Sequence, residues 1–147
     1  MKKPKYLYHG SSRKLKGKKL IPKKPSDIGK TKENKLKGVF ATDIKQAAIV
    51  MALLSCKGVG NSSLSVINKK RARGIVYSGW PKQEYIYLYI LPSKGFDNMP
   101  KGSWQWISFE PVKPLKTVKF KVSGYLDLID KATKKEKEKF KELKKRG

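Results

Sequence analysis

The single histidine of the chain stands where a side chain could do chemistry. His9 ends the aromatic run KYLYH at residues 5–9 and is followed by Gly10 and Ser11. Alternation in such a run is typical of a β-strand, and Gly-Ser-Ser is typical of the turn after it. Histidine exchanges protons near neutral pH, so a strand-end histidine can act as a hydrogen-bonding or acid–base group. Because there is one histidine, mechanisms and metal sites that need two are excluded.

Two further segments carry polar or aromatic groups next to expected strands. GVFATD at residues 38–43 places Phe40 and Thr42 on a short apolar strand that leads into a helix. WQWISFEPVKP at residues 104–114 carries Gln105 and Glu110. Side chains alternate along a strand, so Gln105 and Glu110 would face opposite sides if the strand continued past Phe109.

Together, the three segments resemble the ADP-ribosyltransferase fold, in the branch shared by poly-ADP-ribose polymerases and diphtheria-type toxins. The resemblance covers the order of elements over roughly residues 5–122. It implies that NAD binds between two small sheets and is consumed as a substrate, with no metal ion. The activity it implies is transfer of ADP-ribose to a protein or nucleic-acid acceptor.

The resemblance also implies a role for individual residues. His9 would donate a hydrogen bond to a ribose hydroxyl, and the Gly10 backbone would approach the nicotinamide carboxamide, where a side chain would block contact. Phe40 would stack on the nicotinamide. Ser11 and Thr42 would be further contacts to NAD.

One departure from the family pattern affects catalysis. Gln105 occupies the position of the family's catalytic glutamate, and a neutral amide supplies hydrogen bonds without the charge that stabilises an oxocarbenium ion. Gln105 therefore predicts weak transfer, an unusual acceptor, or a domain that binds NAD without reacting. Glu110 is a candidate displaced carboxylate, and Glu84 and Asp97 are looser candidates.

Each candidate also has a structural interpretation. His9 can be a strand-end histidine that satisfies a backbone group, and Phe40 can be a core residue. Trp104 and Trp106 share a strand face, so they either pack in the core or form a wall of the site. Cys56 is interpreted as a buried small apolar residue, because the sequence places no second cysteine or helix histidine near it.

The charge of the chain points to anionic partners. Its 147 residues include 36 Lys and Arg against 11 Asp and Glu, a net charge of +25 that attracts polyanions. A basic cluster between two expected strands is the candidate nucleic-acid contact: Lys69, Lys70, Arg71 and Arg73. The alternative is a lysine-rich composition that reflects heat adaptation or an AT-rich genome.

Two functions from different classes follow. The first is the NAD-dependent transferase; the second is a non-catalytic basic module on the same fold that binds RNA, DNA or a nucleic-acid-associated protein. RNA 2′-phosphotransferases also use NAD, but they depend on further His and Arg residues. The acidic residues show no metal-ligand spacing. One cysteine fits a reducing compartment, and no apolar run reaches the roughly 18 residues of a membrane span, so we expect a cytoplasmic protein without a membrane partner.

The element order predicts a single α+β domain over residues 1–147, with a mainly antiparallel split sheet and few helices. A helix should follow Asp43, with Asp43 as its cap and Gln46 completing a capping box. Residues 13–36 are expected to form a long basic loop, and residues 131–147 a charged helix. Strands are expected at residues 5–9, 38–42, 62–67, 74–78, 84–91, 104–109 and 117–122.

Overall fold

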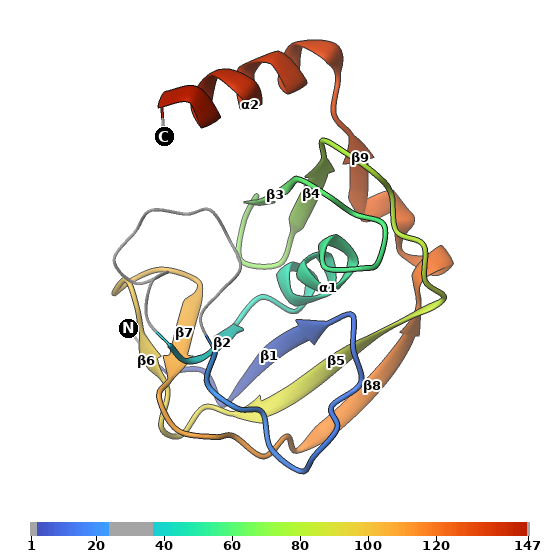
Figure 1. Ribbon diagram of the computed structural model, residues 1–147. Coiled ribbons are helices and arrows are strands. Elements are labelled where there is room, and N and C mark those ends of the chain that lie inside the picture. Colours follow the sequence, from blue (N-terminus) through green and yellow to red (C-terminus); the bar gives the residue numbers. More distant parts are fainter. Residues whose placement is uncertain (1–2, 24–36, 147) are drawn as a thin grey trace.

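The computed structural model describes residues 3–23 and 37–146, which form two β-sheets with a helix between them (Figure 1). The larger sheet has the strand order β6-β7-β2-β1-β5-β8, and the smaller one β3-β4-β9. The strands are β1 (Tyr6–Ser11), β2 (Val39–Thr42), β3 (Ser62–Val66), β4 (Ala72–Val76), β5 (Tyr85–Pro92), β6 (Asp97–Asn98), β7 (Gln105–Ser108), β8 (Lys116–Lys121) and β9 (Ile129–Lys131). The helices are α1 (Lys45–Leu54) and α2 (Lys134–Arg146), and the 3-10 turns are Val122–Gly124 and Leu126–Leu128.

The prediction of a mainly antiparallel α+β fold is confirmed. All the strand pairs of the larger sheet are antiparallel, and within the described ranges only β4 and β9 pair in parallel. Strand β5 pairs with β1 on one side and β8 on the other. Its sequence YIYLYILP is apolar or aromatic on both faces, as expected for a strand inside a sheet.

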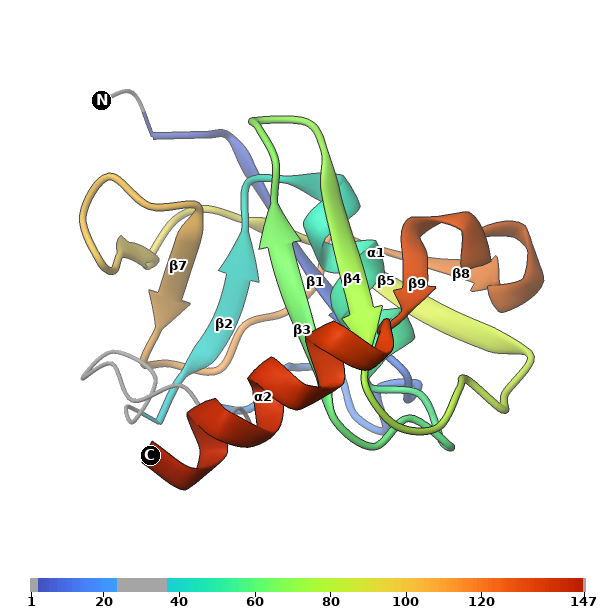
Figure 2. The same cartoon turned by 90° about the horizontal axis from the view of Figure 1, so that it is seen from above.

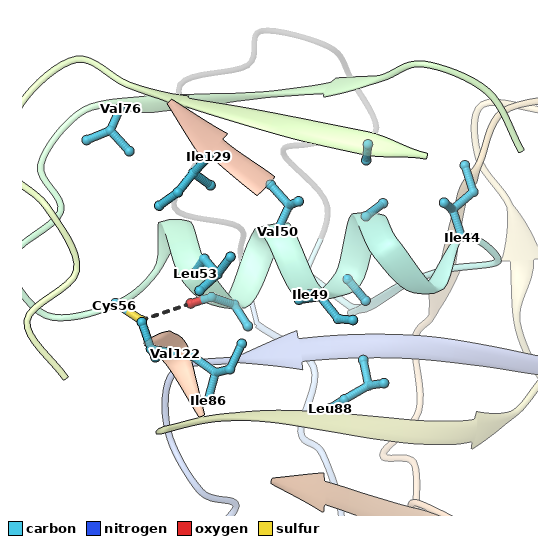
Figure 3. Packing of buried hydrophobic residues seen from close by; sticks show 14 residues of the cluster. Ile44, Ile49, Val50, Leu53, Cys56, Val76, Ile86, Leu88, Val122 and Ile129 are labelled. Atoms are coloured by element: carbon cyan, nitrogen blue, oxygen red, sulfur yellow. Dashed lines mark hydrogen bonds between the residues drawn. The ribbon is translucent and has the colours of Figure 1, made fainter. Parts of the chain in front are cut away.

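Helix α1 is buried between the two sheets (Figure 3). Its Ala48, Val50 and Leu53 are fully covered, because the larger sheet packs on one side and the smaller sheet on the other. A helix that is apolar nearly all round needs this kind of position. The helix thereby fixes the spacing of the two sheets.

The start of α1 differs from the predicted capping box. The N-cap residue is Ile44, without a side-chain cap hydrogen bond. The Ile44 N–H donates to Thr42 Oγ1 at 3.0 Å, and Gln46 Oε1 accepts from the Ala72 N–H at 2.8 Å. Gln46 therefore satisfies a backbone donor of β4 in the other sheet, which a local capping pattern does not reveal.

A second core lies on the face of the larger sheet that is turned away from α1. Leu7, Leu91 and Trp106 belong to it, and so does Leu20 from the segment of residues 13–23 that crosses this face. Leu20 and Val112 exchange two backbone hydrogen bonds, of 2.7 and 2.9 Å, which hold the segment down. Residues 13–23 contain no helix and no strand longer than an isolated bridge, and residues 24–36 of the expected basic loop lie outside the described residues.

Other expected boundaries move by a few residues. Strand β4 begins at Ala72, because Ala72 pairs with Val66 of β3. Residues 129–131 form β9, so Lys131 ends a strand instead of beginning the terminal helix, as was expected. Helix α2 begins after Thr133, whose Oγ1 accepts from the Glu136 N–H while Glu136 Oε1 accepts from the Thr133 N–H, which is a capping box.

Helix α2 lies beside the smaller sheet (Figure 2). The ring of Phe140 stacks on Tyr77, with centroids 4.3 Å apart and an interplanar angle of 11°. The rest of the helix is largely exposed where its side chains are described. Neither helix in the described ranges is long and apolar enough to cross a membrane.

Candidate functional site

A cavity of about 760 Å³ lies between the larger sheet and the segment of residues 13–23. His9 and Ser11 of β1 and Tyr89 of β5 form its floor. They project from the face of the sheet opposite α1, because their neighbour Gly10 packs against α1. The volume is within the range of about 300–1,000 Å³ found for small-molecule sites.

His9 presents a hydrogen-bond acceptor to this cavity. Its Nδ1 lies 2.6 Å from the Phe40 carbonyl oxygen. A carbonyl only accepts, so Nδ1 carries the proton, and Nε2 has no partner among the described residues. Burial lowers the pKa of His9, the hydrogen bond to Phe40 acts in the opposite direction, and the charge of Lys23 lowers the pKa further. The ring is therefore neutral at neutral pH, and a ligand hydroxyl would donate to Nε2, the reverse of the direction that the resemblance implies.

The cavity wall is strongly positive. The segment that covers it contributes six cations, and no carboxylate belongs to the lining within residues 3–23 and 37–146. Such a wall favours a ligand with several negative charges, such as a pyrophosphate. The six cations are Arg13, Lys14, Lys16, Lys18, Lys19 and Lys23.

Tyr89 fastens this segment to the sheet. Its buried hydroxyl accepts from the Leu15 N–H at 2.6 Å and donates to the Arg13 carbonyl at 3.2 Å. Burial raises the pKa of Tyr89, while the hydrogen bond from Leu15 lowers it and nearby Tyr87 raises it. Tyr89 was not predicted to belong to the site. The sequence signal for it was a tyrosine in a strand that is apolar on both faces, because a buried tyrosine hydroxyl needs a hydrogen-bond partner.

Gly10 serves packing in this structure. A Cβ at Gly10 would lie 1.8 Å from the Ala48 carbonyl oxygen of α1, so no larger residue fits without moving the helix. The neighbouring Ser11 lines the cavity, and its Oγ accepts from the Arg13 N–H at 3.1 Å. Of the two residues, Ser11 is the one whose side chain lies on the cavity side of the sheet.

Phe40 and Thr42 have different positions. Phe40 lines the cavity, and its backbone carbonyl accepts a hydrogen bond from His9, although alternation places its side chain on the same face of β2 as Thr42. Thr42 is fully buried, outside the cavity lining, and its hydroxyl serves the start of α1. Tyr8 pairs with Thr42, and directly opposed residues share a face, so Thr42 is on the α1 side while His9 is on the other.

Gln105 and Glu110 also lie outside the cavity lining. Gln105 pairs with Thr42 and therefore shares its face, and its Nε2 donates to the Met99 carbonyl at 3.0 Å. Strand β7 ends at Ser108, before Glu110, which is exposed. The structure thus brings His9, Ser11 and Phe40 together at the cavity and places these two polar candidates elsewhere.

The basic cluster occupies the turn between β3 and β4. Lys69, Lys70 and Arg71 are exposed there, and the backbone N–H groups of Lys70 and Arg71 donate to the Asn68 side chain. Arg73 differs, because it is bound within the fold: its guanidinium forms an ion pair with Asp130 at 2.8 Å and donates to the Asp127 carbonyl at 3.0 Å. The first three are available to a partner.

Asp43 lies close to the start of α1. Burial raises its pKa, whereas the indole N–H of Trp106, without reaching the geometry of a formed hydrogen bond, and the charge of Lys69 lower it. No group of three or more His, Cys, Asp or Glu suited to a metal ion occurs among the residues that the structure describes.

Comparison of the chain with protein-family models, curated proteins and solved structures found no match. The interpretation of the site therefore depends on its geometry and on the residues themselves.

Proposed function

We propose that the chain is an ADP-ribosyltransferase-like protein that binds NAD in the cavity beside His9. The observation that carries the proposal is the composition of that cavity: among the described residues, its neutral histidine has no partner at Nε2, and its lining includes six cations and no carboxylate. NAD combines ribose hydroxyls, which can donate to Nε2, with a pyrophosphate that the lysines can neutralise. The resemblance of YLYHGS and GVFATD to the NAD-binding fold supports the same ligand.

The positive charge of the cavity lining limits catalysis. Transfer breaks the bond between ribose C1 and nicotinamide, nicotinamide leaves with the bonding electron pair, and positive charge develops on the ribose. A nearby carboxylate would stabilise that charge, whereas the lysines of the wall oppose it. We therefore propose tight binding relative to turnover, with slow transfer of ADP-ribose to a protein or nucleic-acid acceptor.

Calorimetric titration with NAD tests the proposal. The wild type should bind, and His9→Ala should bind more weakly because one hydrogen bond to the ribose is lost, an effect of about 0.5–1.5 kcal/mol or up to about tenfold in Kd. Lys16→Glu/Lys18→Glu should weaken binding further. The matched control is Lys94→Glu/Lys101→Glu, which changes the net charge equally at exposed positions outside the cavity.

Separate titrations with ADP-ribose and nicotinamide assign the halves of the ligand. Binding of ADP-ribose that the cavity variants lose and the control retains would support the proposal. Absence of NAD binding at millimolar concentration, or equal losses in the cavity variants and the control, would refute it.

A second candidate function is nucleic-acid binding without catalysis. It is favoured by the exposed Lys69, Lys70 and Arg71 in one tight turn, together with the net charge of +25. Cations at a hairpin turn can contact successive phosphates, and such binding should weaken steeply with salt. His9→Ala should leave it unchanged, which separates it from NAD binding.

A further inference from the structure

A second cavity, of about 480 Å³, lies on the opposite side of the larger sheet from the His9 cavity. It is an open depression lined by the start of α1, the turn between β3 and β4, Phe120 of β8, and residues of and beside the 3-10 turns after β8. Phe120 of β8 shows on which face of the larger sheet this cavity lies. Phe120 pairs with Ile86, and Ile86 packs in the core around α1, so the cavity is on the α1 face (Figure 3). The two cavities are therefore separate sites.

Aromatic rings form one wall of this second cavity. Phe120 and Tyr125 line it and meet edge to face, with centroids 5.1 Å apart and an interplanar angle of 71°. Both residues are partly exposed. Aromatic side chains with accessible surface beside a cavity are suited to contact with a flat heterocycle.

Charged groups complete the lining. Lys45 of α1 and Lys70 of the β3–β4 turn are both exposed and come from segments far apart in the sequence. Lys70 is continuous with Lys69 and Arg71, so the cations extend from the cavity along the turn. Asp127 also lines the cavity, and its carboxylate can accept from an amino group or a ring N–H of a base, including N3–H of uracil.

We propose that this cavity binds one unpaired base of a single-stranded nucleic acid, with the flanking phosphates on Lys45 and Lys70. The inference rests on the second candidate function, nucleic-acid binding, and is independent of NAD. Single strands are favoured over duplexes because the base must present its face to protein rings, which stacking prevents inside a helix. The aromatic rings would contact the face of the base, the two lysines its flanking phosphates, and the Asp127 carboxylate a donor on the edge of the base.

Fluorescence anisotropy with a labelled oligouridine of about 12 nucleotides, within the size range of single-strand sites, is the direct test. Lys45→Glu/Lys70→Glu should weaken binding at least tenfold, and the slope of log affinity against log salt should fall by about 1.4, the value for two lost phosphate contacts on a single strand. Lys94→Glu/Lys101→Glu, with the same change in net charge, should lose less than about threefold.

An abasic oligonucleotide of the same length isolates the base contact. It should bind the wild type about tenfold more weakly than oligouridine, because stacking on aromatic side chains is worth a factor of about 5–150. Tyr125→Leu should bind the two oligonucleotides with nearly equal affinity. Circular dichroism and thermal melting confirm that each variant is folded.

The outcomes separate the inference from the function on which it rests. Failure of the wild type to bind any oligonucleotide would refute both. Three results with a wild type that binds tightly would overturn the inference alone. They are equal losses of affinity in Lys45→Glu/Lys70→Glu and its control, equal affinity for the abasic oligonucleotide and oligouridine, and equal affinity for a duplex. A larger loss in Lys45→Glu/Lys70→Glu than in the control, together with the abasic effect and its disappearance in Tyr125→Leu, would support it.

Discussion

Replacing Gly10 by alanine tests whether this glycine serves the ligand or the fold. In the resemblance the glycine lets the backbone approach nicotinamide, whereas in this structure it lies against the backbone of α1. The added Cβ would meet the Ala48 carbonyl oxygen at 1.8 Å and the Ala48 carbonyl carbon at 2.7 Å. Real Cβ contacts stay above 3.0 Å, so β1 and α1 must separate by about 1.2 Å.

The cost of this movement should be large. Rotamer changes cannot relieve a contact between Cβ and a backbone carbonyl, and α1 is held on its other side by the smaller sheet. Inserting a methyl group into a well-packed core costs about 1–3 kcal/mol and occasionally more. We expect about 3 kcal/mol for Gly10→Ala, which for a chain of this length lowers Tm by about 10 °C.

Urea and thermal denaturation followed by circular dichroism measure this loss. Gly17→Ala is the matched control, because Gly17 lines the His9 cavity but a Cβ there would have nothing within 4 Å. We expect the control to change the free energy of unfolding by less than about 1 kcal/mol. A Gly10→Ala protein that melts with the wild type but binds NAD tenfold more weakly would refute the packing argument and restore the ligand role.

Three further predictions concern single side chains. Burial holds the pKa of His9 in the folded state below its ordinary value of about 6.5, so the unfolded chain takes up a proton at a higher pH than the folded chain. The free energy of unfolding should therefore fall as the pH decreases from about 6.5 toward the folded pKa, and this fall should be smaller in His9→Gln. Burial raises the pKa of Cys56 to about 11, and its thiol donates to the Ala52 carbonyl. A thiol reagent should therefore label the folded chain far more slowly than the unfolded chain, and equal labelling rates would contradict the assignment of Cys56 as a buried, unreactive thiol. Tyr89→Phe removes both hydrogen bonds to the segment of residues 13–23 and should lower the free energy of unfolding by about 1–3 kcal/mol, with faster hydrogen exchange at the Leu15 amide. Tyr85→Phe should leave that exchange unchanged, because the Tyr85 hydroxyl forms no hydrogen bond to this segment as far as the structure describes it.

The elements that the sequence predicts well have local signals. Strand β5 carries an aromatic and apolar run, and α1 has apolar residues at helical spacing, so both are visible without knowledge of their neighbours. Strand β9 has no such signal, because it is three residues long and exists through parallel pairing with β4, more than 50 residues earlier. Thr133 and Glu136 have the sequence spacing of a capping box, but the terminal helix was predicted to begin at residue 131 without use of that signal.

The site was predicted in part for a related reason. His9 and Ser11 are neighbours on one strand, so their shared face follows from alternation alone. The six cations reach the same cavity because Leu20 pairs with Val112 and Tyr89 holds Leu15, contacts between segments about 70–90 residues apart. No local pattern encodes such contacts, and the basic loop was therefore expected but its place above His9 was not.

Register decides whether Gln105 can reach a ligand beside His9. Tyr8 pairs with Thr42 and Thr42 with Gln105, so Gln105 shares a face with Tyr8, and a slip of one residue in either pairing would reverse this. Gln105→Glu should consequently leave the affinity for NAD unchanged within about twofold and should not create NAD cleavage, because the new carboxylate would lie across the sheet from the bound ribose. Assays of nicotinamide release on wild type and Gln105→Glu measure this, with binding followed in parallel. Release that rises tenfold or more in Gln105→Glu would show that the ligand sits on the Gln105 face, and the assignment of NAD to the His9 cavity would then be wrong.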